Sequence, residues 1–335
     1  MNLPSPKAIW QMADEELLSI LDKDLLLQKS KSVRFYAPSF MYYKTRHYCS
    51  SPADFPTISV TGKDCALNCK HCGGRVLDTM YPVGTPDELF QLCVKLKSEG
   101  ALGCLISGGC LPDGSVPLEK FVGAISRVKH ELGLTVFVHT GIVSLDIAQR
   151  LRKANVDAAL IDIIGSDETI KGIYNLDVTV EDYESSLKAL HEADIAFVPH
   201  VIVGIHYGKL KGEQCALEMI KQCDPSALVI IAFMPIRGTE MENTEPPTPT
   251  DIARVAAAAR LTFPKTPLVL GCMRPRGRHR VKTDVLAIKA GVDAVAFPAE
   301  EAVEFAERRG LVTSFSSLCC SQIYSDLGKL KDTRQ

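Results

Sequence analysis

The chain has 335 residues, of which 46% are hydrophobic and 23% are charged, and its formal net charge is −2. This balanced charge gives no electrostatic reason to expect a nucleic acid or a membrane surface as a partner. No apolar run reaches transmembrane length and the N-terminus has no signal-peptide core, so we expect a cytoplasmic protein. In a reducing compartment its twelve cysteines are thiols rather than disulfides, and several of them are candidate metal ligands.

The first part of the chain predicts a cover over a larger domain. Leu17, Leu21 and Leu25 recur at helical spacing, which predicts helix within residues 1 to 30. An aromatic-rich stretch then runs from Arg34 to Cys49, and its Pro38 argues against a regular central strand. This stretch is interpreted either as a segment packed on the main domain or as a substrate-lining segment.

From Thr57 onward, short apolar runs alternate with amphipathic segments. Strands are predicted at 57–61, 103–107, 135–139, 158–163, 196–205, 227–233, 268–270 and 294–297. Helices are predicted at 86–99, 118–132, 145–154, 180–193, 213–223, 249–261, 283–290 and 300–309. This pattern predicts an α/β fold with a parallel sheet, a (β/α)8 TIM-type barrel or a barrel that is not fully closed. The barrel would span residues 51–310, between an N-terminal extension (1–50) and a C-terminal extension (311–335).

Three cysteines follow the first of these strands at the spacing C-x3-C-x2-C, namely Cys65, Cys69 and Cys72. Three thiolates on one loop can hold three irons of a [4Fe–4S] cluster and leave the fourth iron open to a small molecule. The alternatives are a zinc loop, with His71 inside the loop, and three unrelated core cysteines. Zinc sites of this kind need a second CxxC or HxxxH pair, and the sequence has none at the usual distance. The spacing therefore favours the iron–sulfur cluster.

This cysteine motif resembles that of the radical S-adenosylmethionine (SAM) superfamily. The resemblance implies that the open iron chelates SAM and that reduction releases a 5′-deoxyadenosyl radical. Cys110 stands after Gly108 and Gly109, where the family often has glutamate. The resemblance also implies a set of contacts to SAM. The polar members of this set have a second interpretation, as side chains that only cap strand ends. The resemblance implies SAM contacts at Gly108, Gly109, His139, Asp162, Val203, Gly204, Met234 and Pro235.

The segment from Gly271 to Arg280 carries four arginines in ten residues, after the seventh predicted strand. One interpretation is a solvated basic loop. The other is an anion site for the SAM carboxylate or for an acidic partner.

Three stretches resemble the first subunit of the two-component, archaeal-type lipoyl synthase, which is related to biotin synthase. They are Arg34–Cys49, the cysteine loop and Leu105–Gly114. The resemblance implies sulfur insertion into an octanoyl chain on a lysine of a carrier, either a lipoyl domain or the glycine-cleavage H protein. It also implies a second lipoyl synthase subunit and a reducing electron carrier as partners. It leaves open which carbon, C6 or C8, this subunit serves.

Sulfur insertion requires a sulfur source close to the carbon radical, which predicts an auxiliary cluster. Cys49 and the adjacent pair Cys319 and Cys320 are the candidate ligands, because the two ends of the chain flank the predicted barrel. The alternative is that the adjacent cysteines are merely packed. The candidates for the fourth ligand are Cys110, Cys272, Ser317 and Ser321.

Two other functional classes stay open at this stage. One is a radical SAM enzyme of another kind, such as biotin-synthase-like sulfur insertion into a free small molecule. The other is an iron–sulfur electron-transfer protein without radical chemistry. Release of 5′-deoxyadenosine on anaerobic reduction with SAM separates an enzyme from an electron carrier.

Overall fold

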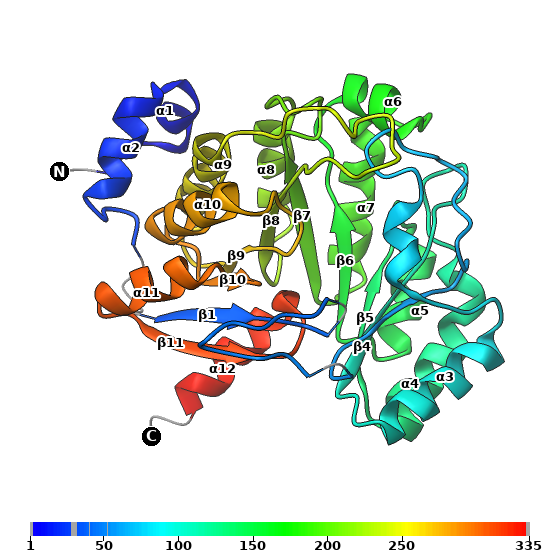
Figure 1. The fold of residues 1–335 in the computed structure, drawn as a ribbon. Coiled ribbons are helices and arrows are strands. Elements are labelled where there is room, and N and C mark those ends of the chain that lie inside the picture. Colours follow the sequence, from blue (N-terminus) through cyan, green and yellow to red (C-terminus); the bar gives the residue numbers. More distant parts are fainter. Residues whose placement is uncertain (1–2, 28–31, 40, 52, 333–335) are drawn as a thin grey trace.

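The computed structural model describes residues 3–27, 32–39, 41–51 and 53–332. Its centre is one sheet of eleven strands, all of whose described pairs are parallel, in the order β11-β1-β10-β9-β8-β7-β6-β5-β4-β2-β3. The sheet curls, and helices follow it around its outer side (Figure 1). Among the described strands, the edges β11 and β3 are not paired with each other, so the architecture is an open version of the predicted barrel.

The strands are β1 (Ser32–Tyr36), β2 (Thr57–Ser59), β3 (Tyr81–Pro82), β4 (Gly103–Ser107), β5 (Thr135–His139), β6 (Ala158–Asp162), β7 (Phe197–Val203), β8 (Leu228–Ala232), β9 (Leu268–Leu270), β10 (Ala294–Ala296) and β11 (Val312–Ser316). The helices of the main body are α3 (Pro86–Ser98), α4 (Val122–Leu132), α5 (Leu145–Lys153), α6 (Asp167–Tyr174), α7 (Val180–Glu192), α8 (Glu213–Lys221), α9 (Pro249–Thr262), α10 (Arg278–Lys289) and α11 (Glu300–Arg308). The terminal helices are α1 (Pro6–Gln11), α2 (Asp14–Asp22) and α12 (Ile323–Asp332).

Local chemistry explains where many of these helices begin. Thr85, Ser144 and Ser166 each accept a hydrogen bond from a backbone N–H in the first turn of α3, α5 and α6. Thr179 and Thr248 form capping boxes at the start of α7 and α9. Within the sheet, β6 to β8 are almost continuously buried, as expected for parallel strands covered on both faces.

The terminal segments add two strands to the sheet, β1 and β11, that the sequence pattern did not predict. β1, from the aromatic-rich extension, lies between β10 and β11 in the sheet. The N-terminal helices α1 and α2 pack outside, where Arg254 of α9 donates to the carbonyl of Ile9 at 2.6 Å. After β11 the chain turns inward, and Cys320 and Ser321 are buried. In the described part of the chain, no helix is both long and apolar enough to cross a membrane.

Candidate functional site

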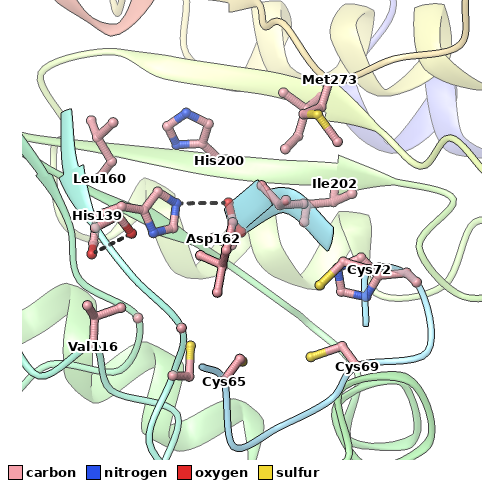
Figure 2. Close-up of a pocket in the computed structure, with 18 of the residues that line it drawn as sticks. Cys65, Cys69, Cys72, Val116, His139, Leu160, Asp162, His200, Ile202 and Met273 are labelled. Carbon is pink, nitrogen blue, oxygen red and sulfur yellow. Dashed lines mark hydrogen bonds and ion pairs between the residues drawn. The ribbon is translucent and has the colours of Figure 1, made fainter. Parts of the chain in front are cut away.

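A cavity of about 420 Å³ lies inside the curl of the sheet. This volume is in the range of roughly 300–1,000 Å³ that is usual for small-molecule sites. Figure 2 shows side chains from the cysteine loop, from β6 and β7 and from the segment after β9 around the same space. The wall is largely apolar and includes Leu105, Val116, Leu160, Ile202, Val229 and Ile231.

Cys65, Cys69 and Cys72 all line this cavity, on the loop that follows β2. The loop is held by backbone hydrogen bonds: the N–H of Ala66 donates to the carbonyl of Cys110 at 2.8 Å. On the other side, the N–H of Lys70 donates to the carbonyl of Ile173 in α6 at 2.9 Å. The sequence analysis missed α6, although its N-cap Ser166 and the acidic residues behind it were a readable signal.

Neighbouring hydrogen bonds favour the ionised form of two loop thiols. The pKa of Cys65 falls to about 5, because the thiol of Cys110 and backbone N–H groups donate to it. Cys69 and Cys72 form a pair in which the hydrogen bond raises the pKa of Cys69 and lowers that of Cys72. Thiolates are the form of cysteine that binds metals, so Cys65 and Cys72 are held in the required state, whereas Cys69 would lose its proton when a metal binds. All three are free of disulfides.

The loop does not have the geometry of a mononuclear zinc site. Among the described residues, the cysteine loop contains no group of three candidate ligand atoms within 4.8 Å of one another. His71 is half-buried, its buried Nδ1 has no hydrogen-bond partner, and desolvation lowers its pKa to about 4.

Five of the eight predicted SAM contacts line the cavity, and three do not. Val203 is buried but points away, because side chains alternate along a strand and its neighbours His200 and Ile202 face inward. Gly204 has a φ of +71° and packs against Pro247 instead. Pro235 also lies outside the lining. The five that line the cavity are Gly108, Gly109, His139, Asp162 and Met234.

Gly109 has a structural role that the sequence analysis did not foresee. A Cβ atom added there would lie 2.0 Å from the carbonyl oxygen of Asp64 and 2.6 Å from the Cβ of Cys65. Its N–H donates to the hydroxyl of Thr61 at 2.8 Å. Glycine is therefore required here for the cysteine loop to pack against the end of β4, whatever the ligand.

Two buried polar atoms next to the loop have no protein partner. The hydroxyl of Tyr174 and Nδ1 of His71 are both unpaired, and the two rings are 4.9 Å apart. Both residues line the cavity. Since an unpaired buried polar group costs about 1–3 kcal/mol, these atoms are suited to a polar ligand.

The candidate auxiliary ligands separate into two groups. Cys319 and Cys320 line the cavity, and so do Cys110 and Cys272. The thiol of Cys320 donates a hydrogen bond to Cys319. This bond lowers the pKa of Cys319 and raises that of Cys320. Cys49 is exposed and is not among the lining residues. Of the aromatic-rich stretch, Pro38 lines the cavity, whereas Phe40 lies outside the described residues.

The arginine-rich segment contains a structural ion pair rather than four free cations. Arg274 is fully buried and its guanidinium bonds both carboxylate oxygens of Asp284, at 2.7 and 2.9 Å. It also donates to the carbonyl of Gly271 at 2.6 Å. Arg274 thus fixes the turn that presents Cys272 and Met273 to the cavity, and it is not available to an external anion.

Comparison with known proteins agrees with this geometry. Residues 59–211 match the family model described as the radical SAM superfamily. This part of the chain is therefore similar to radical SAM proteins. The chain is similar to the biotin synthase of Leptospira biflexa, with 25% identity over 272 residues, covering 78% of this chain and 74% of that protein.

Two solved structures share the fold of this chain. Methylornithine synthase aligns with a TM-score of 0.60 and 15% identity, covering 92% of this chain and 93% of that one. The [FeFe]-hydrogenase maturase HydG aligns with a TM-score of 0.62 and 13% identity, covering 97% and 80%. At these identities the likeness concerns the fold alone.

The residues of the site fit the cofactors that the family implies, a [4Fe–4S] cluster and SAM. Cys65, Cys69 and Cys72 would hold the cluster, and they reach the cavity from one tightly bonded loop. The unpaired atoms of His71 and Tyr174 lie beside them. When bound, the two cofactors supply a 5′-deoxyadenosyl radical, and the apolar wall keeps that radical from water.

A substitution at Gly109 tests this arrangement. Gly109→Ala is expected to displace the loop and lower the rate of 5′-deoxyadenosine release by about a hundredfold, the cost of a small misplacement of reacting groups. The matched control is Gly123→Ala in α4, where nothing lies within 4 Å of the added Cβ and activity should not change. Iron content and 5′-deoxyadenosine are measured on both. Equal activity of the two variants would contradict the role given to Gly109.

Proposed function

We propose that this radical SAM protein inserts sulfur into C–H bonds of an octanoyl chain that is attached to a carrier protein, as one subunit of a two-component lipoyl synthase. One observation carries the proposal. The lining of a single cavity with largely apolar walls includes both the cysteine loop and Cys272, Cys319 and Cys320. Sulfur insertion needs such an arrangement, with a radical source, an alkyl chain and a sulfur source within reach of one another.

The side chains divide the work as follows. Cys65, Cys69 and Cys72 hold the radical SAM cluster, and Gly108 and Met234 border SAM. His139 and Asp162, at which the resemblance implies SAM contacts, lie in the same lining at the ends of β5 and β6. The apolar wall receives the octanoyl chain and excludes water from the radical.

The sulfur source in this proposal is a second cluster on the C-terminal segment. Cys319 and Cys320 are two of its ligands. Cys272 lies in the same lining and is a better third ligand than the exposed Cys49. Ser321 lines the cavity with an unpaired hydroxyl oxygen and is the candidate for a weakly held fourth ligand.

The partners follow from this chemistry. The substrate is an octanoylated lipoyl domain or glycine-cleavage H protein, and a second lipoyl synthase subunit completes the pair of sulfur insertions. A reducing electron carrier supplies the electron for SAM cleavage. Such oxygen-sensitive clusters are suited to the cytoplasm.

The similarity to biotin synthases favours a second candidate, sulfur insertion into a free small molecule. The same cavity and the same cysteines would serve it. The two candidates differ in whether the alkyl chain arrives on a protein.

Incubation with an octanoylated carrier tests the proposal. The reconstituted protein is mixed anaerobically with reductant, SAM, the second subunit and octanoylated H protein, and the carrier is analysed by mass spectrometry. Sulfur is expected on the carrier-bound chain and not on free octanoate in a parallel reaction. An unmodified carrier, with 5′-deoxyadenosine released normally, would reject the proposed substrate and leave the radical SAM assignment in place.

A further inference from the structure

Three polar side chains meet in the otherwise apolar wall of the cavity: His139, Asp162 and His200. Sheet register brings them together, because Asp162 of β6 is the direct partner of His200 in β7, and His139 of β5 pairs with Leu160, two residues before Asp162. The Nε2 atom of His139 is 3.4 Å from Oδ1 of Asp162. One ligand atom from each of the three lies within 4.8 Å of the others (Figure 2).

His200 is oriented by its backbone. Its Nδ1 lies 3.1 Å from the carbonyl oxygen of Val198. A carbonyl only accepts hydrogen bonds, so Nδ1 carries the proton and Nε2 keeps its lone pair. A backbone carbonyl on the second ring nitrogen is the usual arrangement behind a metal-binding histidine. The functions described above leave His200 without a role.

The three groups suit a cation. Burial lowers the pKa of His200 to about 4, so that its ring is neutral and able to bind a metal at neutral pH. Burial disfavours the charged forms of His139 and Asp162, but their mutual attraction outweighs it, so the pKa of His139 is raised and that of Asp162 is lowered. An ion that binds here therefore replaces the proton of His139. The side chains of His139 and Asp162 are 25% and 33% exposed, and they line the cavity, so an ion can reach them from within it.

We propose that His139, Asp162 and His200 bind one ferrous ion in the wall of the cavity, separate from the cluster on the cysteine loop. Two imidazoles and one carboxylate are the ligand set typical of mononuclear Fe²⁺ sites with open coordination positions. Here the open positions face the space in which the alkyl chain is expected. The site requires neither sulfur insertion nor a carrier protein, so it stands or falls separately from the proposed function.

Mössbauer spectroscopy of the full chain reconstituted with ⁵⁷Fe tests this site. Wild-type protein is expected to show cluster iron and, in addition, about one high-spin ferrous ion per chain with nitrogen and oxygen ligands. His200→Ala should lose this ferrous signal and keep the cluster signal, which also reports that the protein is folded. The matched control is His206→Ala, whose Nε2 lies at the same 3.4 Å from a carboxylate, that of Glu168, outside the cavity lining. It should keep both signals.

Three outcomes would overturn the site. They are a wild-type spectrum with cluster iron alone, a ferrous signal unchanged in His200→Ala, and loss of the ferrous signal when SAM is added. The last result would mean that SAM, and not a ferrous ion, binds to His139 and Asp162. If His200→Ala fails to fold, Asp162→Asn replaces it, because this change keeps the volume of the side chain and removes its charge. A ferrous signal unchanged in Asp162→Asn would likewise reject the proposal.

Discussion

Replacing Cys65, Cys69 and Cys72 together with alanine is expected to remove about four irons per chain and to abolish release of 5′-deoxyadenosine. The three thiols are the protein ligands of the cluster in the arrangement described above, and they line the cavity from one loop. Without them the protein has no means of reducing SAM. Iron analysis and chromatography of the reaction products after anaerobic reconstitution measure both effects.

The variant is expected to fold, which makes the result interpretable. The loop is fixed mainly by backbone groups, such as the N–H of Ala66 on Cys110 and that of Lys70 on Ile173. The thiol of Cys69 adds one hydrogen bond, to the carbonyl of Tyr174 at 3.5 Å. Far-ultraviolet circular dichroism should therefore match that of the wild type. Cys215→Ala serves as the control, since this cysteine lies on α8 and is not among the lining residues. Full iron content and SAM cleavage in the triple variant would reject the assignment.

Local sequence patterns were sufficient to predict the cysteine loop and eight of the eleven described strands of the curled sheet, all except β1, β3 and β11. The predicted strands 103–107, 135–139 and 268–270 coincide with β4, β5 and β9. Short apolar runs between capped helices are a local signal, and so is the spacing of three cysteines. The fold class is confirmed in its open form.

Features that depend on distant parts of the chain were not predictable in this way. β1 was missed because Pro38 suggested an irregular segment, yet the strand ends at Tyr36, before the proline. Its partners β10 and β11 lie at the other end of the chain, and no local pattern announces such pairing. α10 begins at Arg278, earlier than predicted, because part of the arginine-rich segment is helical.

The residues that line the cavity likewise fall into two groups: those that a local pattern predicts and those that only the sheet register reveals. Asp162 and His139 were predicted because they end strands, where barrels place their chemistry. His200 lies inside β7 and was read as part of an apolar strand. Only the register between β6 and β7 reveals that it faces Asp162. Val203 was predicted as a SAM contact, but Ile202 lines the cavity instead. Which residues of a strand face inward is not known from the sequence until one inward residue is fixed.

Replacing Cys319 and Cys320 together with alanine is expected to abolish sulfur transfer to the octanoylated carrier while SAM cleavage continues. The pair lies on the segment after β11, which turns into the cavity, whereas the radical SAM thiols come from the loop after β2. The two sets of ligands belong to different elements, so that loss of one need not disturb the other. The auxiliary iron should be lost and the radical SAM iron retained.

Single substitutions then identify the third ligand of the auxiliary cluster. Cys272→Ala is expected to reproduce the loss of auxiliary iron, because Cys272 lines the cavity with the pair. Cys49→Ala is expected to have little effect, because this cysteine is exposed and outside the lining. The reverse result would mean that the stretch before Cys49 closes over the cavity when the cluster is bound.

Three readouts on one sample keep the outcomes of the double variant distinct: iron content, 5′-deoxyadenosine and thiolated carrier. Loss of all three would indicate a folding defect, and conservative replacement of the pair by serine would then be used instead. Loss of thiolation with retained SAM cleavage is the expected result, since a carbon radical without a nearby sulfide has nothing to bond to. Normal sulfur transfer by the double variant would show that Cys319 and Cys320 only pack in the interior. The sulfur source would then have to lie elsewhere.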